Sequence, residues 1–137
     1  MLGSIALLAT ANLSAANFVI GSLAFVFSLG AFWWTYWSVR RYRFAFAFSS
    51  CAPTAIVQVG PYAYVRHPFY VAYLLGWFAT FAVSPGLASG GIFLLMAIIY
   101  FSAASVEEAA IATSPHAAEY ASYKARVGMF IPFRFGK

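Results

Sequence analysis

The 137-residue chain is far more apolar than a water-soluble domain of its size. Hydrophobic residues make up 64% of it, aromatic residues 20% and charged residues only 8%, against about 25% charged in an average globular protein. A small soluble domain leaves a large share of its surface exposed and could not bury this much apolar area. The composition therefore excludes an ordinary soluble domain and predicts an all-α integral membrane helical bundle, with residues 1–137 forming a single membrane domain.

The net charge of +5 does not indicate nucleic-acid binding. The basic residues flank apolar segments and do not form the basic and aromatic stripe of a single-strand-binding protein. Lys and Arg beside membrane spans set orientation and attract anionic headgroups, so membrane lipids are the expected partners and nucleic acid is not. The single cysteine, Cys51, excludes an internal disulfide and a thiolate metal cluster, and no metal site is expected.

The first predicted span is the uncharged segment 17–39, because about 20 apolar residues cross a bilayer as a helix. It ends in Trp and Tyr residues followed by a basic cluster at residues 40–43. An aromatic belt before a basic cluster is typical of a span that ends on the cytoplasmic side. The preceding segment, 2–13, is apolar but too short to cross alone. It is either a half-helix, an interfacial segment or part of a short fourth span.

Two further spans are predicted to form a helical hairpin. Segment 44–65 contains prolines and glycine that break long helices, and we expect an interfacial segment and loop there. Segment 68–83 begins with a proline, which suits the first helical turn because its missing N–H would be unpaired there anyway. Turn residues at 84–86 separate it from a third span at 87–106.

The remaining residues, 107–137, are predicted to form a cytoplasmic tail. Charged residues and tyrosines alternate over 109–126, which favours an amphipathic helix on the cytoplasmic surface, bent or restarted at Ser114-Pro115. The basic residues beside the spans all fall on one side, and this asymmetry predicts a multi-pass protein with that side cytoplasmic. A bundle of about three spans is thin and could pair with itself to bury more surface.

The hairpin brings Glu107 and Glu108 to the same membrane level as Arg66 and His67. The chain has only three acidic residues, and carboxylates near a membrane are costly, so they indicate a functional site by default. The alternative is an ordinary solvated helix end. An acidic pair at a helix C-terminus also opposes the macrodipole unless the helix continues into the next segment.

His67, Tyr70, Leu74 and Trp77 are spaced to share one face of the second span. His67 alone would be an ordinary interfacial histidine, and the tyrosines alone would be belt aromatics. Together with an arginine and two carboxylates, they predict a corner that could hold a zwitterionic, ring-bearing cofactor.

Three motifs occur in order: Gly60-Pro61-Tyr62-x-Tyr64-Val65-Arg66-His67-Pro68-x-Tyr70, then Glu107-Glu108 after the hairpin, then Glu119-Tyr120-x-x-Tyr123-Lys124-x-Arg126-Val127 closing on Ile131-Pro132-Phe133. In order and spacing they resemble the isoprenylcysteine carboxyl methyltransferase family. That family belongs to a wider group of membrane methyltransferases with the phospholipid N-methyltransferases. The resemblance covers about residues 54–133.

The resemblance implies S-adenosylmethionine as methyl donor and a lipophilic small-molecule or lipidated acceptor, such as a prenylcysteine-type carboxylate. Carried over by position, the cofactor-binding residues would be Thr54, Ala55, Ile56, Val57, Tyr62, His67, Pro68, Phe69, Tyr70, Glu107 and Glu108, and the catalytic residues would be Arg66, His67 and Glu107. Glu107 would pair with the cofactor's amino group or ribose hydroxyls, and tyrosine faces would suit the sulfonium. Such a transfer needs no metal, because proximity and orientation supply most of the rate.

One departure bears on the acceptor. Relatives that methylate a prenylcysteine carboxylate usually carry an arginine one helical turn before the first glutamate, and here that residue is Ala103. A thioether carboxylate, a phospholipid amine and a small hydrophobic compound all stay open. Two other readings are a non-catalytic membrane scaffold of the same fold and an NADPH-dependent sterol-type reductase. The reductase shares the Arg-His-Pro-x-Tyr motif but normally needs more basic residues.

Overall fold

The computed structural model describes residues 14–40 and 56–132. Its elements are α2 (Ala15–Val39), the 3-10 helix η1 (Gly60–Ala63), α3 (Pro68–Val83), α4 (Leu87–Ala112) and α5 (Ala117–Lys124). The all-helical prediction is confirmed for these residues, which contain no strand beyond one isolated bridge. The predicted segment 2–13, and residues 41–55 with most of the predicted loop, lie outside the described residues.

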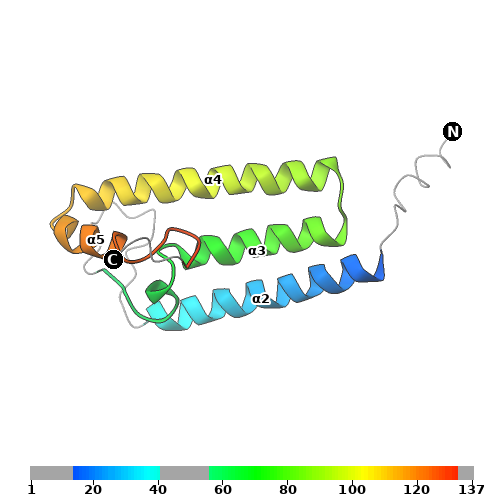
Figure 1. Cartoon of the computed structure of the whole chain (residues 1–137), viewed down its shortest axis with the longest axis horizontal. Helices are drawn as coiled ribbons and strands as arrows, with labels where there is room; N and C mark the ends of the chain where they lie inside the picture. The colour runs from blue at the N-terminus through cyan, green and yellow to red at the C-terminus, as the bar shows by residue number, and fades with distance from the viewer. Residues whose placement is uncertain (1–13, 41–55, 133–137) are drawn as a thin grey trace.

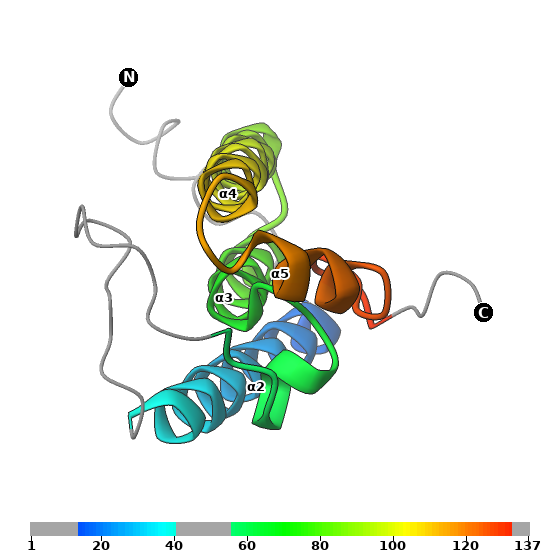
Figure 2. The same ribbon diagram turned by 90° about the vertical axis from the view of Figure 1, so that its left-hand side faces the viewer.

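The three long helices lie side by side, and α5 and η1 lie at the same end of them (Figures 1 and 2). Within the described ranges, α2 and α4 are the two helices long and apolar enough to cross a membrane. The shorter α3 is also apolar and has 16 residues. α2 begins at Ala15, two residues before the predicted start, because the Ser14 hydroxyl accepts a hydrogen bond from the Ala16 N–H at 3.2 Å and caps the helix.

Small residues bring α2 and α3 close together. Gly21, Ser28 and Thr35 recur every seven residues and are all buried on α2. The Ser28 hydroxyl donates to the Ala72 carbonyl oxygen of α3 at 2.7 Å. A Cβ at Gly21 would lie 2.9 Å from the Ala79 carbonyl oxygen. This close backbone approach through small residues is the packing typical of membrane helix pairs.

The α3–α4 hairpin is joined mainly by aromatic side chains. The rings of Tyr70 and Tyr100 stack at 5.3 Å between centroids, and those of Phe81 and Phe93 stack at 6.4 Å. The Trp77 indole N–H donates to the Tyr100 hydroxyl at 3.3 Å. Because large aromatic rings keep the two backbones apart, α3 and α4 contact each other through the ends of their side chains.

The third predicted helix is longer than expected. α4 continues to Ala112, six residues past the predicted end at 106, because no proline or glycine interrupts it before Ser114-Pro115. The predicted amphipathic helix over 109–126 is therefore divided between the end of α4 and the eight-residue α5. α4 therefore continues past Glu107 and Glu108 to Ala112. The unfavourable interaction of these two carboxylates with the helix macrodipole is weaker there than at the last residue of a helix.

Candidate functional site

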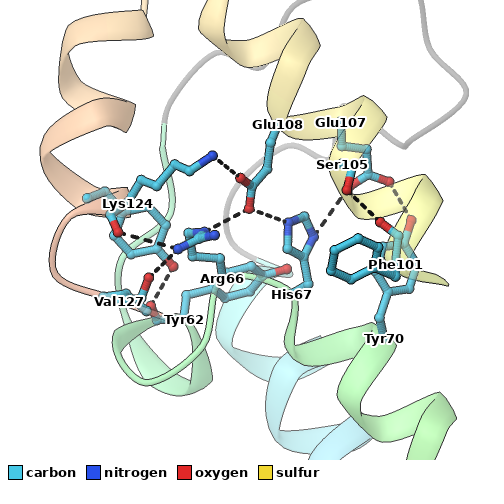
Figure 3. Close-up of polar contacts among 11 residues, drawn as sticks. Tyr62, Arg66, His67, Tyr70, Phe101, Ser105, Glu107, Glu108, Lys124 and Val127 are labelled. Carbon is cyan, nitrogen blue, oxygen red and sulfur yellow. Dashed lines mark hydrogen bonds and ion pairs between the residues drawn. The ribbon is translucent and has the colours of Figure 1, made fainter. Parts of the chain in front are cut away.

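Glu108 is the centre of an ion cluster at the α5 end of the bundle (Figure 3). Its side chain is only 4% exposed, and its carboxylate lies 2.8 Å from the Arg66 Nε and 2.7 Å from the Lys124 Nζ. The His67 Nε2 lies 3.2 Å from the same carboxylate. A buried charge is tolerated when it is paired and hydrogen-bonded. Glu108 meets this condition with groups from two segments of the chain, the residues just before α3 and the end of α5.

Arg66 is fixed by the chain that follows α5. Its guanidinium donates to the Val127 carbonyl oxygen. The backbone N–H groups of Arg66 and His67 donate to the carbonyl oxygens of Gly128 and Met129, at 2.9 and 3.2 Å. The chain after α5 therefore fastens the segment that leads into α3, and it holds Arg66 in place to meet Glu108.

Glu107 has different surroundings from Glu108. Consecutive residues of a helix point about 100° apart, and the Glu107 side chain is 35% exposed. Its carboxylate accepts a hydrogen bond from the Tyr70 hydroxyl at 2.5 Å, and the other oxygen lies 3.6 Å from the His67 Nδ1. Among the described residues, no Lys or Arg pairs with it. Glu107 is therefore the accessible carboxylate of the site.

His67 lies between the two carboxylates and is buried. Its ring stacks on Tyr70 at 5.6 Å and lies 6.0 Å from the Phe130 ring. Burial lowers the pKa of His67, and this effect outweighs Glu107 and Glu108, which raise it. The imidazole is accordingly neutral at pH 7.

Two tyrosines, Tyr62 of η1 and Tyr123 of α5, line one side of the site. The Tyr123 hydroxyl of α5 donates to the Tyr62 carbonyl oxygen at 2.6 Å. Burial raises the pKa of Tyr62, and it raises the pKa of Tyr123 to about 12. Both phenols are therefore neutral hydrogen-bonding groups near the cluster.

The structure brings together Arg66, His67, Tyr70, Glu107 and Glu108 of the predicted site. The remaining predicted residues are placed as follows: Pro68 is buried in the first turn of α3, Tyr62 lies in η1, and Ile56 and Val57 are partly buried in the segment before η1. Thr54 and Ala55 lie outside the described residues.

Phe69 has a partner away from the ion cluster. Its ring packs edge-on against Phe32 of α2 at 5.6 Å, so it contributes to the α2–α3 interface. The segment before η1 is tied to α5 instead: the Gln58 amide donates to Glu119 and accepts from Arg126, each at 3.2 Å.

Lys124 is the residue to which sequence reasoning gave no role in the site. Lys124 belongs to the third sequence motif, but its distance along the chain from Glu108 does not predict a contact between the two side chains. The structure pairs the two across α4 and α5. Tyr100 was also missed, although it lies two helical turns before Glu107 and therefore on the same face of α4.

A pocket of about 420 Å³ lies between α4 and α5. Its lining residues are Glu108, Ala112, Ala117, Ala118, Tyr120, Ala121 and Lys124. The volume falls in the range of small-molecule sites. Because Glu107 does not line it, the pocket lies on the Glu108 side of α4.

Comparison with known proteins identifies the group to which the chain belongs. A family model described as phospholipid methyltransferase matches residues 16–114, which is more than half of the chain. No curated protein and no solved structure matches. The match confirms the wider group indicated by the three motifs. The chain therefore belongs to the phospholipid methyltransferase family and is a membrane methyltransferase.

Proposed function

We propose that the protein transfers a methyl group from S-adenosylmethionine to the amine of a membrane lipid. The observation that carries this proposal is the division of charge in the site. Arg66 and Lys124 both pair with Glu108, whereas Glu107 is accessible and has no Lys or Arg partner among the described residues. A prenylcysteine-type carboxylate would need a cation there, and Ala103 supplies none. An accessible carboxylate suits a protonated amine.

The proposed topology has three spans. α2 and α4 are long enough to cross directly, whereas a 16-residue helix rises only about 24 Å and would need a locally thinned bilayer. The basic residues Arg40, Arg66, Lys124 and Arg126 gather at the end of the bundle that carries the site. The positive-inside rule makes this end cytoplasmic, and a soluble cofactor is available on that side.

The residues around Glu107 fit such a cofactor. Glu107 would accept hydrogen bonds from its amino group, and the face of Tyr62 would lie near its sulfonium, a contact worth about 0.5–2 kcal/mol. When bound, the cofactor supplies an electrophilic methyl group. As this methyl is transferred, the positive charge passes from the sulfur to the acceptor nitrogen, and the buried rings around His67 keep water away from the reacting atoms.

A lipid acceptor would enter between α3 and α4. The rings of Tyr73 and Phe101 are exposed on the two helices of this hairpin, and the Tyr70–Tyr100 stack continues from them to Glu107. An aromatic surface that begins among exposed apolar residues and ends at a carboxylate matches a molecule with an acyl body and an amine head.

The first test is ligand stabilisation of the detergent-purified protein, measured by thermal shift. S-adenosylhomocysteine should raise the melting temperature and NADPH should not, because a ligand of the native state stabilises it by mass action. Stabilisation by NADPH alone would support a reductase, and no response to either compound would support a non-catalytic scaffold.

The second test addresses the site and the acceptor. Glu107→Gln and His67→Ala should abolish the shift with S-adenosylhomocysteine, while the control Glu119→Gln, on the exposed side of α5, should keep it. Transfer of labelled methyl groups should occur to vesicles of an amine-headed phospholipid and not to prenylcysteine analogues. Tight cofactor binding by Glu107→Gln, or methylation of the prenylcysteine analogues alone, would contradict the proposal.

A further inference from the structure

We propose that Glu108 is a positioning residue that holds the His67 ring in the Nε2–H tautomer, so that Nδ1 can take a proton from the acceptor amine. The inference rests on the proposed function for the identity of the proton donor. Its structural part concerns only the imidazole and the two carboxylates and can be tested without any substrate.

The two ring nitrogens of His67 have unequal partners. Nε2 lies 3.2 Å from the Glu108 Oε1, within hydrogen-bonding distance, whereas Nδ1 lies 3.6 Å from the Glu107 Oε2, beyond it. A neutral imidazole carries one N–H, and a carboxylate can only accept. The shorter contact therefore takes the proton, and the Nδ1 lone pair is left facing Glu107. Figure 3 shows the ring between the two side chains.

Glu108 is suited to this role because it cannot easily move. Its carboxylate is held by Arg66 and Lys124 and is almost fully buried. A fixed carboxylate on one ring nitrogen sets the tautomer and stabilises the imidazolium that forms when the other nitrogen gains a proton. Glu107 and Glu108 from α4, Arg66 from the preceding loop and Tyr70 from α3 are the ionisable groups that face the ring among the described residues.

The reaction requires such a proton acceptor. An alkylamine with a pKa of about 10 is protonated at neutral pH and has no lone pair to attack with. Loss of one proton to the His67 Nδ1 frees the lone pair, which forms the new N–C bond as the S–CH₃ bond breaks and its electron pair stays on sulfur. His67 then releases the proton to water.

The test uses the small number of histidines. The chain contains two, His67 and His116, so protein labelled with ring-¹⁵N histidine gives two imidazole spin systems, and His116→Gln assigns them. At pH 7.5 the His67 ring should show a protonated Nε2 and a bare Nδ1. In Glu108→Ala no acceptor faces Nε2, so the proton should move to Nδ1 or exchange between the two nitrogens. Glu119→Gln, which lies beside His116, should leave the His67 signals unchanged.

Each outcome bears on one part of the inference. A wild-type ring with its proton on Nδ1, or one that averages between tautomers, would overturn it without reference to any variant. So would a Glu108→Ala protein with the wild-type pattern. Should Glu108→Ala fail to fold, the wild-type spectrum alone still decides the tautomer.

A kinetic measurement separates this inference from the proposed function. Glu108→Ala should lower kcat about 100-fold, as expected for losing a positioned base, and should change the acidic limb of the pH–rate profile. KM for the cofactor should change less than threefold, because Glu107 is intact. Absence of methyl transfer to any amine lipid would refute the proposed function while the tautomer result stands. A merely structural role for Glu108 would lower folding yield and leave the pH profile unchanged.

Discussion

The α2–α3 interface and the α3–α4 interface are built in different ways. α2 and α3 approach along their length through Gly21, Ser28 and Ala72, so their backbones leave little room between them. α4 meets α3 through stacked rings along the hairpin and through Glu108 at one end. The first interface is a rigid support. The second is made by side-chain contacts, among the residues that the structure describes.

This difference fits the proposed chemistry. Phe69 ties the first turn of α3 to the rigid side, while Tyr70, the next residue, reaches Glu107 on the other side. A lipid can displace ring contacts at lower cost than it can separate close-packed backbones. The following predictions test the contrast, beginning with the largest effect on stability.

Glu108→Leu should remove the main attachment of α4 at the site end. It leaves the buried Arg66 without its carboxylate, and breaking a buried pair in this way costs about 3–5 kcal/mol. The free energy of unfolding, measured in mixed micelles with increasing SDS, should fall by this amount. The matched change Glu119→Leu on exposed α5 should shift it by less than about 0.5 kcal/mol, and equal losses would show that the cluster does not anchor α4.

Gly21→Ala should loosen the rigid interface. The added methyl would lie 2.9 Å from the Ala79 carbonyl oxygen and within 3.0 Å of the Val83 backbone nitrogen, so the helices must move apart at about 1–3 kcal/mol. Gly30→Ala is the control on the same helix, because a Cβ there meets nothing within 4 Å. It should be neutral or stabilising, since alanine favours helix. Equal effects of the two changes would refute the close approach.

Tyr100→Phe should have a smaller effect, because it keeps the ring stack on Tyr70 and removes only the hydroxyl that accepts from Trp77. Hydrogen bonds between membrane helices contribute about 0.6 kcal/mol on average. The same unfolding assay on Tyr100→Phe, Trp77→Phe and the double variant gives the coupling directly. Strictly additive losses would mean that the bond does not link α3 to α4.

The smallest expected effect is a dependence of stability on pH. Burial lowers the pKa of His67 in the fold, whereas in the unfolded chain it has the ordinary value of about 6.5. The unfolded state therefore binds the proton more readily, so stability is full above pH 6.5 and falls as the pH drops below it. The slope between pH 7.5 and 5.5 should shrink in His67→Gln and persist in His116→Gln. A stability that rises on acidification would contradict the lowered pKa.

The sequence predicts those helix boundaries that have a local chemical cause. Pro68 sets the start of α3, and the turn residues 84–86 separate it from α4. The end of α4 has no such cause near 106, since charged residues are compatible with a helix and only Ser114-Pro115 interrupts it. The predicted end at residue 106 is therefore the point where charged residues begin and not the point where the helix ends.

The site is predictable in part for a similar reason. The hairpin brings Arg66 and His67 level with both glutamates, and this follows from span length alone. The different surroundings of Glu107 and Glu108 do not follow from span length, because the two residues are adjacent and chemically identical in the sequence. Their surroundings differ because Lys124, on a separate helix, packs against one of them. Local pattern contains no information on that contact.

The fastening of Arg66 by Val127, Gly128 and Met129 joins segments that are far apart in the sequence. The contact between Arg66 and Val127 spans 61 residues. The entropy of closing so long a loop must be lost before the contact contributes any stability. The ion cluster therefore closes together with the docking of α5 and of the segment that follows it, and it does not form as a local turn.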